Sequence, residues 1–251
     1  MRLFLSITLL LSTSTLWLSA QSVDKVSYKN ELSFGLGLHT RGFNIATIYS
    51  FNQTANKAFT ALLEFSELKS PKERRLTTEA LTIGGNSNRS FIYGKQNNLY
   101  TMRLGAGQRY YISEKPNKSV VALSFVYSGG LSFGMLKPYY LDLIYRFDPD
   151  GYSIRSERYT ETNKYKFLEP LDINGATGFG AGWDELSLAP GLYAKAGIIF
   201  DWGPNDDISK ILEVGLCMDS YFRSIPLMVE NVKAPFFFNL YMNVYFGKRW
   251  N

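Results

Sequence analysis

The sequence predicts an all-β protein, an eight-stranded antiparallel up-and-down transmembrane β-barrel with long extracellular loops. Three observations support this fold class: alternation with a period of two, strands longer than soluble ones, and connections that alternate in length. In residues 119–135, Phe125 and Leu131 belong to a bulky apolar face, whereas Ser124 and Ser132 belong to a small polar face. A period of two is that of a β-strand with unlike faces. Soluble strands have about five or six residues, and a strand that crosses a bilayer needs about 9–11.

Further segments repeat this pattern, and each is predicted to form one strand. Their bulky apolar residues alternate with residues that are mostly small or polar, so each strand has one face for lipid and one for a crowded interior. The eight predicted strands, in chain order, lie within residues 32–38, 43–51, 59–66, 100–106, 119–135, 192–202, 212–218 and 236–246.

The connections between these strands alternate in length. Residues 52–56, 113–117 and 203–206 form short turns, whereas 68–93 and 137–188 form long loops. The loop at 220–233 is intermediate, and the short first connection alone breaks the trend. Outer-membrane barrels have short periplasmic turns and longer extracellular loops. The alternation therefore predicts that both termini lie in the periplasm. Separately, we expect the loop 137–188 to hold a little structure around Trp183.

A soluble, lipocalin-like barrel is the alternative, because alternation alone does not say which face points inward. A soluble barrel needs a charged exterior, and the small face of residues 119–135 supplies none. Small side chains instead suit the crowded interior of an eight-stranded cylinder. No charged residue falls in the middle of a predicted apolar face, where Lys or Arg would cost about 2–4 kcal/mol at the bilayer midplane.

The N-terminus predicts export. Arg2 precedes an apolar run over residues 3–18, and Ser19-Ala20-Gln21 follows it. A basic start, a short apolar region and small residues at the cut are typical of a signal peptide. We expect residues 1–20 to be a cleavable signal peptide and residues 21–251 to be the outer-membrane β-barrel domain. An uncleaved anchor is the alternative.

Composition argues against several function classes. The net charge is +5, and no run of Lys and Arg is long enough to indicate nucleic-acid binding. One His and one Cys in the whole chain make a metal centre unexpected. Cys217 falls on an inward face as a small filler. We expect no cofactor and no metal.

Charged residues on the predicted inward faces are the first candidate site. Glu64, Arg103, Lys195 and Glu213 fall near the middle of their strands. Buried charges are costly unless they are paired, so we predict barrel-interior ion pairs that plug a closed, non-conducting barrel. Ion or proton passage is the alternative.

Two further candidates lie at the extracellular rim. His39, the only imidazole, is a weak candidate for the general base of an outer-membrane lipid-modifying enzyme, such as a lipid A deacylase or palmitoyltransferase. No serine lies near it in the sequence, and a lone histidine more often ends a strand. The loop 68–93 contains a basic patch that is a candidate for binding lipopolysaccharide phosphates or another partner. The alternative is that these residues only belong to a solvated loop. The patch consists of Lys69, Lys72, Arg74 and Arg75.

Three stretches carry a resemblance to a known group. Residues 68–73 read LKSPKE, residues 93–98 read YGKQNN, and YSGG at 127–130 leads to LKPYY at 136–140. Together they resemble small outer-membrane β-barrel proteins of the Bacteroidota. The resemblance covers most of the mature chain and implies this fold in the outer membrane of a Gram-negative cell. It carries over no catalytic residues.

The leading function hypothesis is a non-enzymatic structural or accessory component of the outer membrane. Its extracellular loops would bind a partner, which is another outer-membrane protein, a secretion or assembly complex, or lipopolysaccharide, because binding usually resides in long loops on a rigid scaffold. A lipid-modifying enzyme centred on His39 and a small channel are the alternatives.

Overall fold

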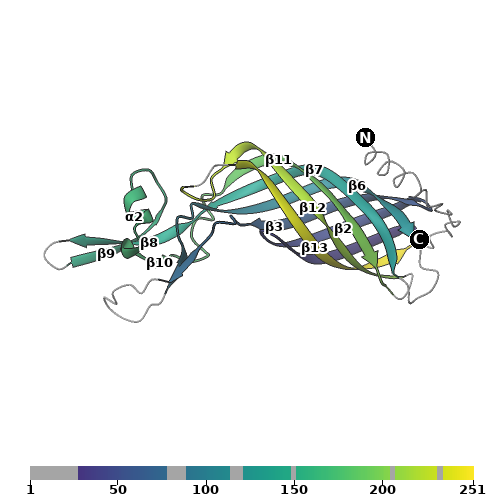
Figure 1. Ribbon diagram of the computed structural model, residues 1–251, viewed down its shortest axis with the longest axis horizontal. Coiled ribbons are helices and arrows are strands. Elements are labelled where there is room, and N and C mark those ends of the chain that lie inside the picture. Colours follow the sequence, from purple (N-terminus) through teal and green to yellow (C-terminus); the bar gives the residue numbers. More distant parts are fainter. Residues whose placement is uncertain (1–27, 78–88, 114–120, 148–150, 204–206, 231–233) are drawn as a thin grey trace, which may run out of the picture.

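The computed structural model describes residues 28–77, 89–113, 121–147, 151–203, 207–230 and 234–251. The predicted signal peptide lies outside these residues. Eight strands close into one antiparallel barrel, in which each strand pairs with its neighbours in the chain and the first pairs with the last (Figure 1). The predicted fold class is confirmed. The barrel strands are β1 (Asn30–His39), β2 (Gly42–Thr54), β3 (Lys57–Leu68), β6 (Asn97–Ser113), β7 (Ala122–Pro138), β11 (Ser187–Asp201), β12 (Ile208–Ile225) and β13 (Ala234–Trp250).

The two ends of the barrel differ. At one end, here called the terminal end, β1 begins beside the end of β13, with Asn30 paired to Trp250. At the other, here called the loop end, the long connections leave the barrel, and β8, β9 and α2 stand beyond it (Figure 1). Several strands are longer than predicted, and β6 and β13 each have 17 residues. The predicted bounds of the connection 137–188 were wrong, because β7 continues to Pro138 and β11 begins at Ser187.

The outer wall of the barrel is apolar on every strand. The inward positions between these residues are buried, as for Ser33 at 2%, Ser132 at 0% and Tyr245 at 0% exposure. Within the described residues, no helix is long and apolar enough to cross a membrane. One outward side chain from each strand in chain order shows the pattern: Leu36 is 60% exposed, Phe43 47%, Leu63 48%, Leu104 40%, Leu131 51%, Leu192 47%, Met218 45% and Leu240 54%.

Tyr100 departs from this outward pattern. Although it shares the apolar face of β6, it is only 8% exposed. The ring of Trp183, from the connection between β7 and β11, stacks on it at 5.6 Å between centroids. Phe65 on β3 stacks on its ring at 6.1 Å. The structure expected around Trp183 is therefore present, and it packs against the barrel wall through Tyr100.

The long connections build a folded unit beyond the loop end, here called the loop-end unit. Its three-stranded sheet has the order β10-β8-β9, and β4 pairs with β5 beside it. The prediction of only a little structure in this region was too modest, because the core joins residues from two separate loops. Phe91, Leu141, Leu143, Phe167 and Ile173 form that core at 0–2% exposure. The elements are β4 (Arg75–Thr77), β5 (Ser90–Ile92), β8 (Tyr140–Phe147), β9 (Gly151–Arg158), α2 (Lys164–Leu168), a 3₁₀ turn (Pro170–Asp172) and β10 (Ile173–Ala176).

Candidate functional site

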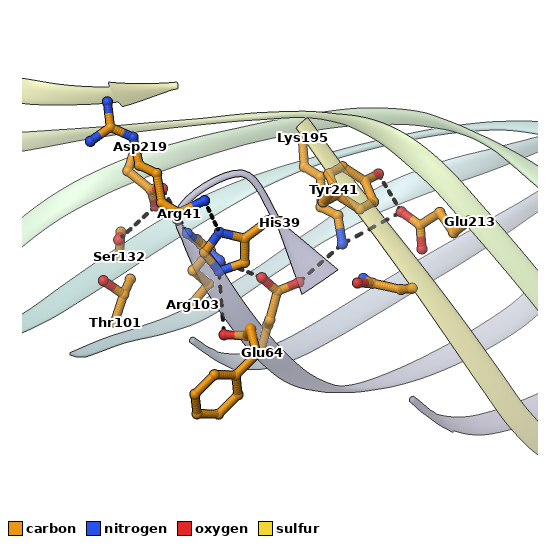
Figure 2. A network of polar contacts seen from close by, with 12 residues as sticks. His39, Arg41, Glu64, Thr101, Arg103, Ser132, Lys195, Glu213, Asp219 and Tyr241 are labelled. Carbon is orange, nitrogen blue, oxygen red and sulfur yellow. Dashed lines mark hydrogen bonds and ion pairs between the residues drawn. The ribbon is translucent and has the colours of Figure 1, made fainter. Parts of the chain in front are cut away.

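Arg103 is the centre of an ion-pair network in the loop-end half of the barrel. It pairs with Glu64, its direct cross-strand neighbour in the register of β3 and β6. On the other side, its Nε and Nη2 donate to the two carboxylate oxygens of Asp219 at 2.8 and 2.7 Å. Ser132 on β7 donates to the same carboxylate at 3.1 Å. Figure 2 shows these side chains meeting inside the barrel, so one guanidinium joins opposite parts of the wall.

Lys195 extends this network to β11, β12 and β13. Its ammonium lies 3.0 Å from Glu64 Oε2 and 3.5 Å from Glu213 Oε1. The Tyr241 ring lies 4.0 Å from the same nitrogen, and the Tyr241 hydroxyl donates to Glu213 (Figure 2). In the register of β11 and β12, Lys195 lies opposite Cys217, which is four positions from Glu213 along β12. The long side chain of Lys195 spans this distance to reach the Glu213 carboxylate. The structure thus brings together the four charged residues chosen from the sequence, and Asp219 joins them.

A second network lies at the terminal end. Arg249 Nε donates to Glu31 Oε2 at 2.9 Å, and its Nη2 contacts Asp201. Arg109 Nη1 lies 3.6 Å from the same Glu31 oxygen. All four side chains are 5% exposed or less. Glu31 and Arg249 were not among the predicted site residues. The period of two, continued past the apolar residues of β1 and β13, places both on the inward faces.

The space between the two networks is filled. Leu62, Val126, Tyr193 and Ile199 belong to a buried apolar layer there. A cavity of about 20 Å³ remains, and Arg109 is among the residues that line it. Such a volume holds about one water molecule. Two charged networks and an apolar layer therefore cross the lumen.

His39 lies at the loop end of β1. Its Nδ1 accepts the backbone N–H of Arg41 at 3.2 Å, and its Nε2 lies 3.3 Å from the Phe43 carbonyl oxygen (Figure 2). A carbonyl accepts only from a protonated nitrogen, so these contacts select the tautomer with its proton on Nε2. Both ring nitrogens are thus used by backbone groups. Within the part of the chain that the structure describes, no hydroxyl lies within hydrogen-bond distance of the ring.

The four basic residues chosen in the first long loop have different surroundings. Lys69 pairs with Glu67 at 3.2 Å, and Arg75 lies on β4. Lys72 and Arg74 line a cleft of about 480 Å³ with Tyr93 and Leu168 from the loop-end unit. Lys69 and Arg75 are not among the residues that line this cleft.

Two polar groups that the sequence analysis missed hold the loops together. Lys95 is 2% exposed and pairs with Glu73 at 3.0 Å. Asp142 on β8 accepts hydrogen bonds from Ser156 at 2.6 Å and Thr177 at 2.7 Å, and it pairs with Arg89 at 3.0 Å. Polar side chains in long loops carry no period, so nothing in the sequence marked these two as buried.

Among the described residues, no group of three or more His, Cys, Asp or Glu side chains could hold a metal ion. Cys217 is a free, buried thiol at 4% exposure and points inward as expected.

The class that this geometry defines is a closed antiparallel barrel with an apolar outer wall and a charged, filled interior. No protein-family model matches the chain, and a search of curated proteins finds no match. Among solved structures, the chain is similar to Neisserial surface protein A at 9% identity and a TM-score of 0.39, over 89% of this chain and 97% of that one. It is also similar to Ail of Yersinia pestis (10% identity, TM-score 0.39, over 89% and 99%) and to a major outer membrane protein from Thermus thermophilus (10%, 0.43, over 87% and 99%). The fold assignment rests on the strand pairing within this chain.

Proposed function

We propose that this chain is an integral outer-membrane β-barrel protein, a non-enzymatic structural or accessory component that presents its loop-end unit to a partner outside the cell. The observation that carries the proposal is the combination of an apolar outer wall with a barrel interior crossed by two ion-pair networks.

The outer wall favours lipid as its surroundings. Apolar side chains that are 40–60% exposed occur on each of the eight strands. Water-soluble monomers rarely expose a continuous apolar patch larger than about 300–600 Å², and a belt around a whole barrel exceeds that limit. A closed antiparallel barrel also satisfies every backbone group within the wall, which a membrane-spanning sheet requires.

The interior favours a scaffold over a channel or an enzyme. A conducting path would have to break the contacts of Arg103 or Arg249 with their carboxylates. An enzyme centred on His39 would need a ring nitrogen that the backbone does not use. These arrangements support a structural role for the barrel.

The loop-end unit supplies the surface for a partner. It has its own core, yet several large side chains around α2 stay exposed, with Tyr165 at 87% and Leu171 at 69%. Large exposed apolar residues on a rigid unit are typical of interaction sites. We propose an outer-membrane protein or a secretion or assembly complex as the partner, with outer-membrane lipid around the barrel.

A pull-down from native membranes in a mild detergent tests the proposal. We expect the wild-type chain to recover the same partner in a reproducible ratio. The double variant Tyr165→Glu/Leu171→Glu should lower that recovery at least about tenfold, because about 1.4 kcal/mol of lost binding free energy is a factor of ten. The control Gln53→Glu/Asn56→Glu makes the same charge change at the terminal end and should recover the partner fully. Repeated recovery of a bare monomer from the wild type would refute the partner role.

A further inference from the structure

A groove opens at the loop-end rim of the barrel, where the β1–β2 turn meets the connection between β12 and β13. Its volume is about 230 Å³. Its walls are mostly apolar, and its cations come from two different connections. The residues that matter for the argument are Arg41, Lys72, Ile225, Leu227, Phe236 and Phe237.

Arg41 is a half-buried cation in this groove. Its Nε donates to the Phe238 carbonyl at 3.4 Å, and its guanidinium carbon lies 5.3 Å from the centre of the Phe237 ring. Within the described residues, no carboxylate lies at ion-pair distance from it, and burial lowers the pKa of its guanidinium from the usual value. A partly desolvated guanidinium with only a ring and a carbonyl as contacts favours a bound anion, and phosphate fits its donors well.

Lys72 is the second cation among the residues that line this groove, and it has a contact of its own. Lys72 lines both this groove and the larger cleft of the loop-end unit. Arg41 and Lys72 therefore line the same groove from two different connections.

The other side of the groove continues into the outer wall. Phe236 is 61% exposed and begins the outward row of β13, where Phe238 follows at 57% and Leu240 at 54%. A ligand seated here would meet cations at one end and the apolar belt at the other. A soluble phosphate would use only the first of these features, whereas a phosphorylated lipid would use both.

We infer that this groove binds the phosphate-bearing headgroup of an outer-leaflet glycolipid, with Arg41 and Lys72 on the phosphate and an acyl chain along Phe236. The inference rests on the proposed function, because it requires the barrel to lie in a membrane with its loop end toward that leaflet.

The test uses the full mature chain in phosphatidylcholine nanodiscs that contain diphosphoryl lipid A, with retained lipid counted by native mass spectrometry. We expect wild type to retain lipid A and Arg41→Gln/Lys72→Gln to retain at least about tenfold less, the effect of about 1.4 kcal/mol. The control Lys57→Gln/Lys210→Gln removes two cations at the terminal end and should behave as wild type. Arg41→Lys should restore part of the binding, because it keeps the charge but loses the fork of donors.

Two competitors separate the possible sources of phosphate. Fully dephosphorylated lipid A should be retained poorly, and inorganic phosphate at millimolar concentration should not displace lipid A. Equal retention of the dephosphorylated lipid, or displacement by inorganic phosphate, would overturn the glycolipid assignment. If wild type enters the nanodiscs but retains no lipid A, only this inference fails; if it does not enter lipid at all, the proposed function fails too.

Discussion

Arg103 joins two buried carboxylates that come from different strands of the barrel. Its guanidinium contacts Glu64 and Asp219, and it is 2% exposed. A buried ion pair adds little net stability over an apolar replacement, but removal of one partner leaves an uncompensated charge. Here the loss of Arg103 would remove the cation that pairs with Asp219, whereas Glu64 would keep its ion pair with Lys195. A substitution at this position is therefore expected to destabilise the barrel interior.

We expect Arg103→Ala to lower the free energy of unfolding by about 3–5 kcal/mol, because the buried carboxylate of Asp219 loses its cation and Glu64 loses one of two. Urea unfolding in lipid vesicles, followed by tryptophan fluorescence, measures the change. Arg155→Ala, an exposed arginine of the loop-end unit, should stay within about 0.5 kcal/mol of wild type. An equal effect of both variants would show that the interior network has no special role in stability.

At the scale of the element, β12 shows how one strand serves two environments. Its inward positions carry Glu213 and Asp219, whereas Leu216 is 44% exposed near its middle. Lys210 and Phe222 stand on the outward face nearer the two ends of the strand. A cation near a strand end can extend to the headgroups, while one at the midplane cannot. The position along the strand therefore sets the cost of a charge.

We expect Leu216→Arg to destabilise the folded barrel in vesicles by about 2–4 kcal/mol and Phe222→Arg by about 0–1 kcal/mol. The cost of an arginine on the lipid face depends on its depth in the bilayer. Both substitutions place arginine on the outward face of the same strand, so each is the other's control. Reversible folding titrations with urea would measure the two values. If neither variant differs from wild type by more than about 0.5 kcal/mol, as is usual for a water-facing surface, then the wall does not face lipid.

At the scale of the whole molecule, the barrel separates two unlike ends. The loop-end unit stands beyond one end on its own core, and the C-terminus lies at the other (Figure 1). The proposed orientation places the loop-end unit outside the cell and both ends of the mature chain in the periplasm.

Cysteine labelling tests this orientation without changing the fold. Tyr165, at 87% exposure on α2, and Asn56, exposed in the β2–β3 turn, are suitable positions for single substitutions to cysteine. We expect a membrane-impermeant maleimide to label Tyr165→Cys on intact cells, and Asn56→Cys only after the outer membrane is permeabilised. Wild type should stay unlabelled, because its one cysteine is buried. Labelling of Asn56→Cys alone on intact cells would reverse the orientation.

Local periodicity accounts for the features that could be predicted from the residues alone. Alternation is read within one strand, so it predicted the eight strands, the apolar outer wall and the inward position of Glu64, Arg103, Lys195 and Glu213. Strand ends were less well predicted, because the period continues into residues such as Glu31 and Arg249 that are not apolar.

Which of these residues meet became known only from the folded chain. Arg103 and Asp219 are 116 positions apart in the chain, and Lys195 and Glu64 are 131 apart. Closure of the barrel and the register of its strands bring such residues together, and neither is encoded in a single segment. The same holds for the loop-end unit, whose core joins Phe91 to Phe167, and for the rim groove, where Arg41 and Lys72 come from different connections. Contacts across a lumen or between loops depend on the whole path of the chain, whereas a strand's two faces depend only on its own residues.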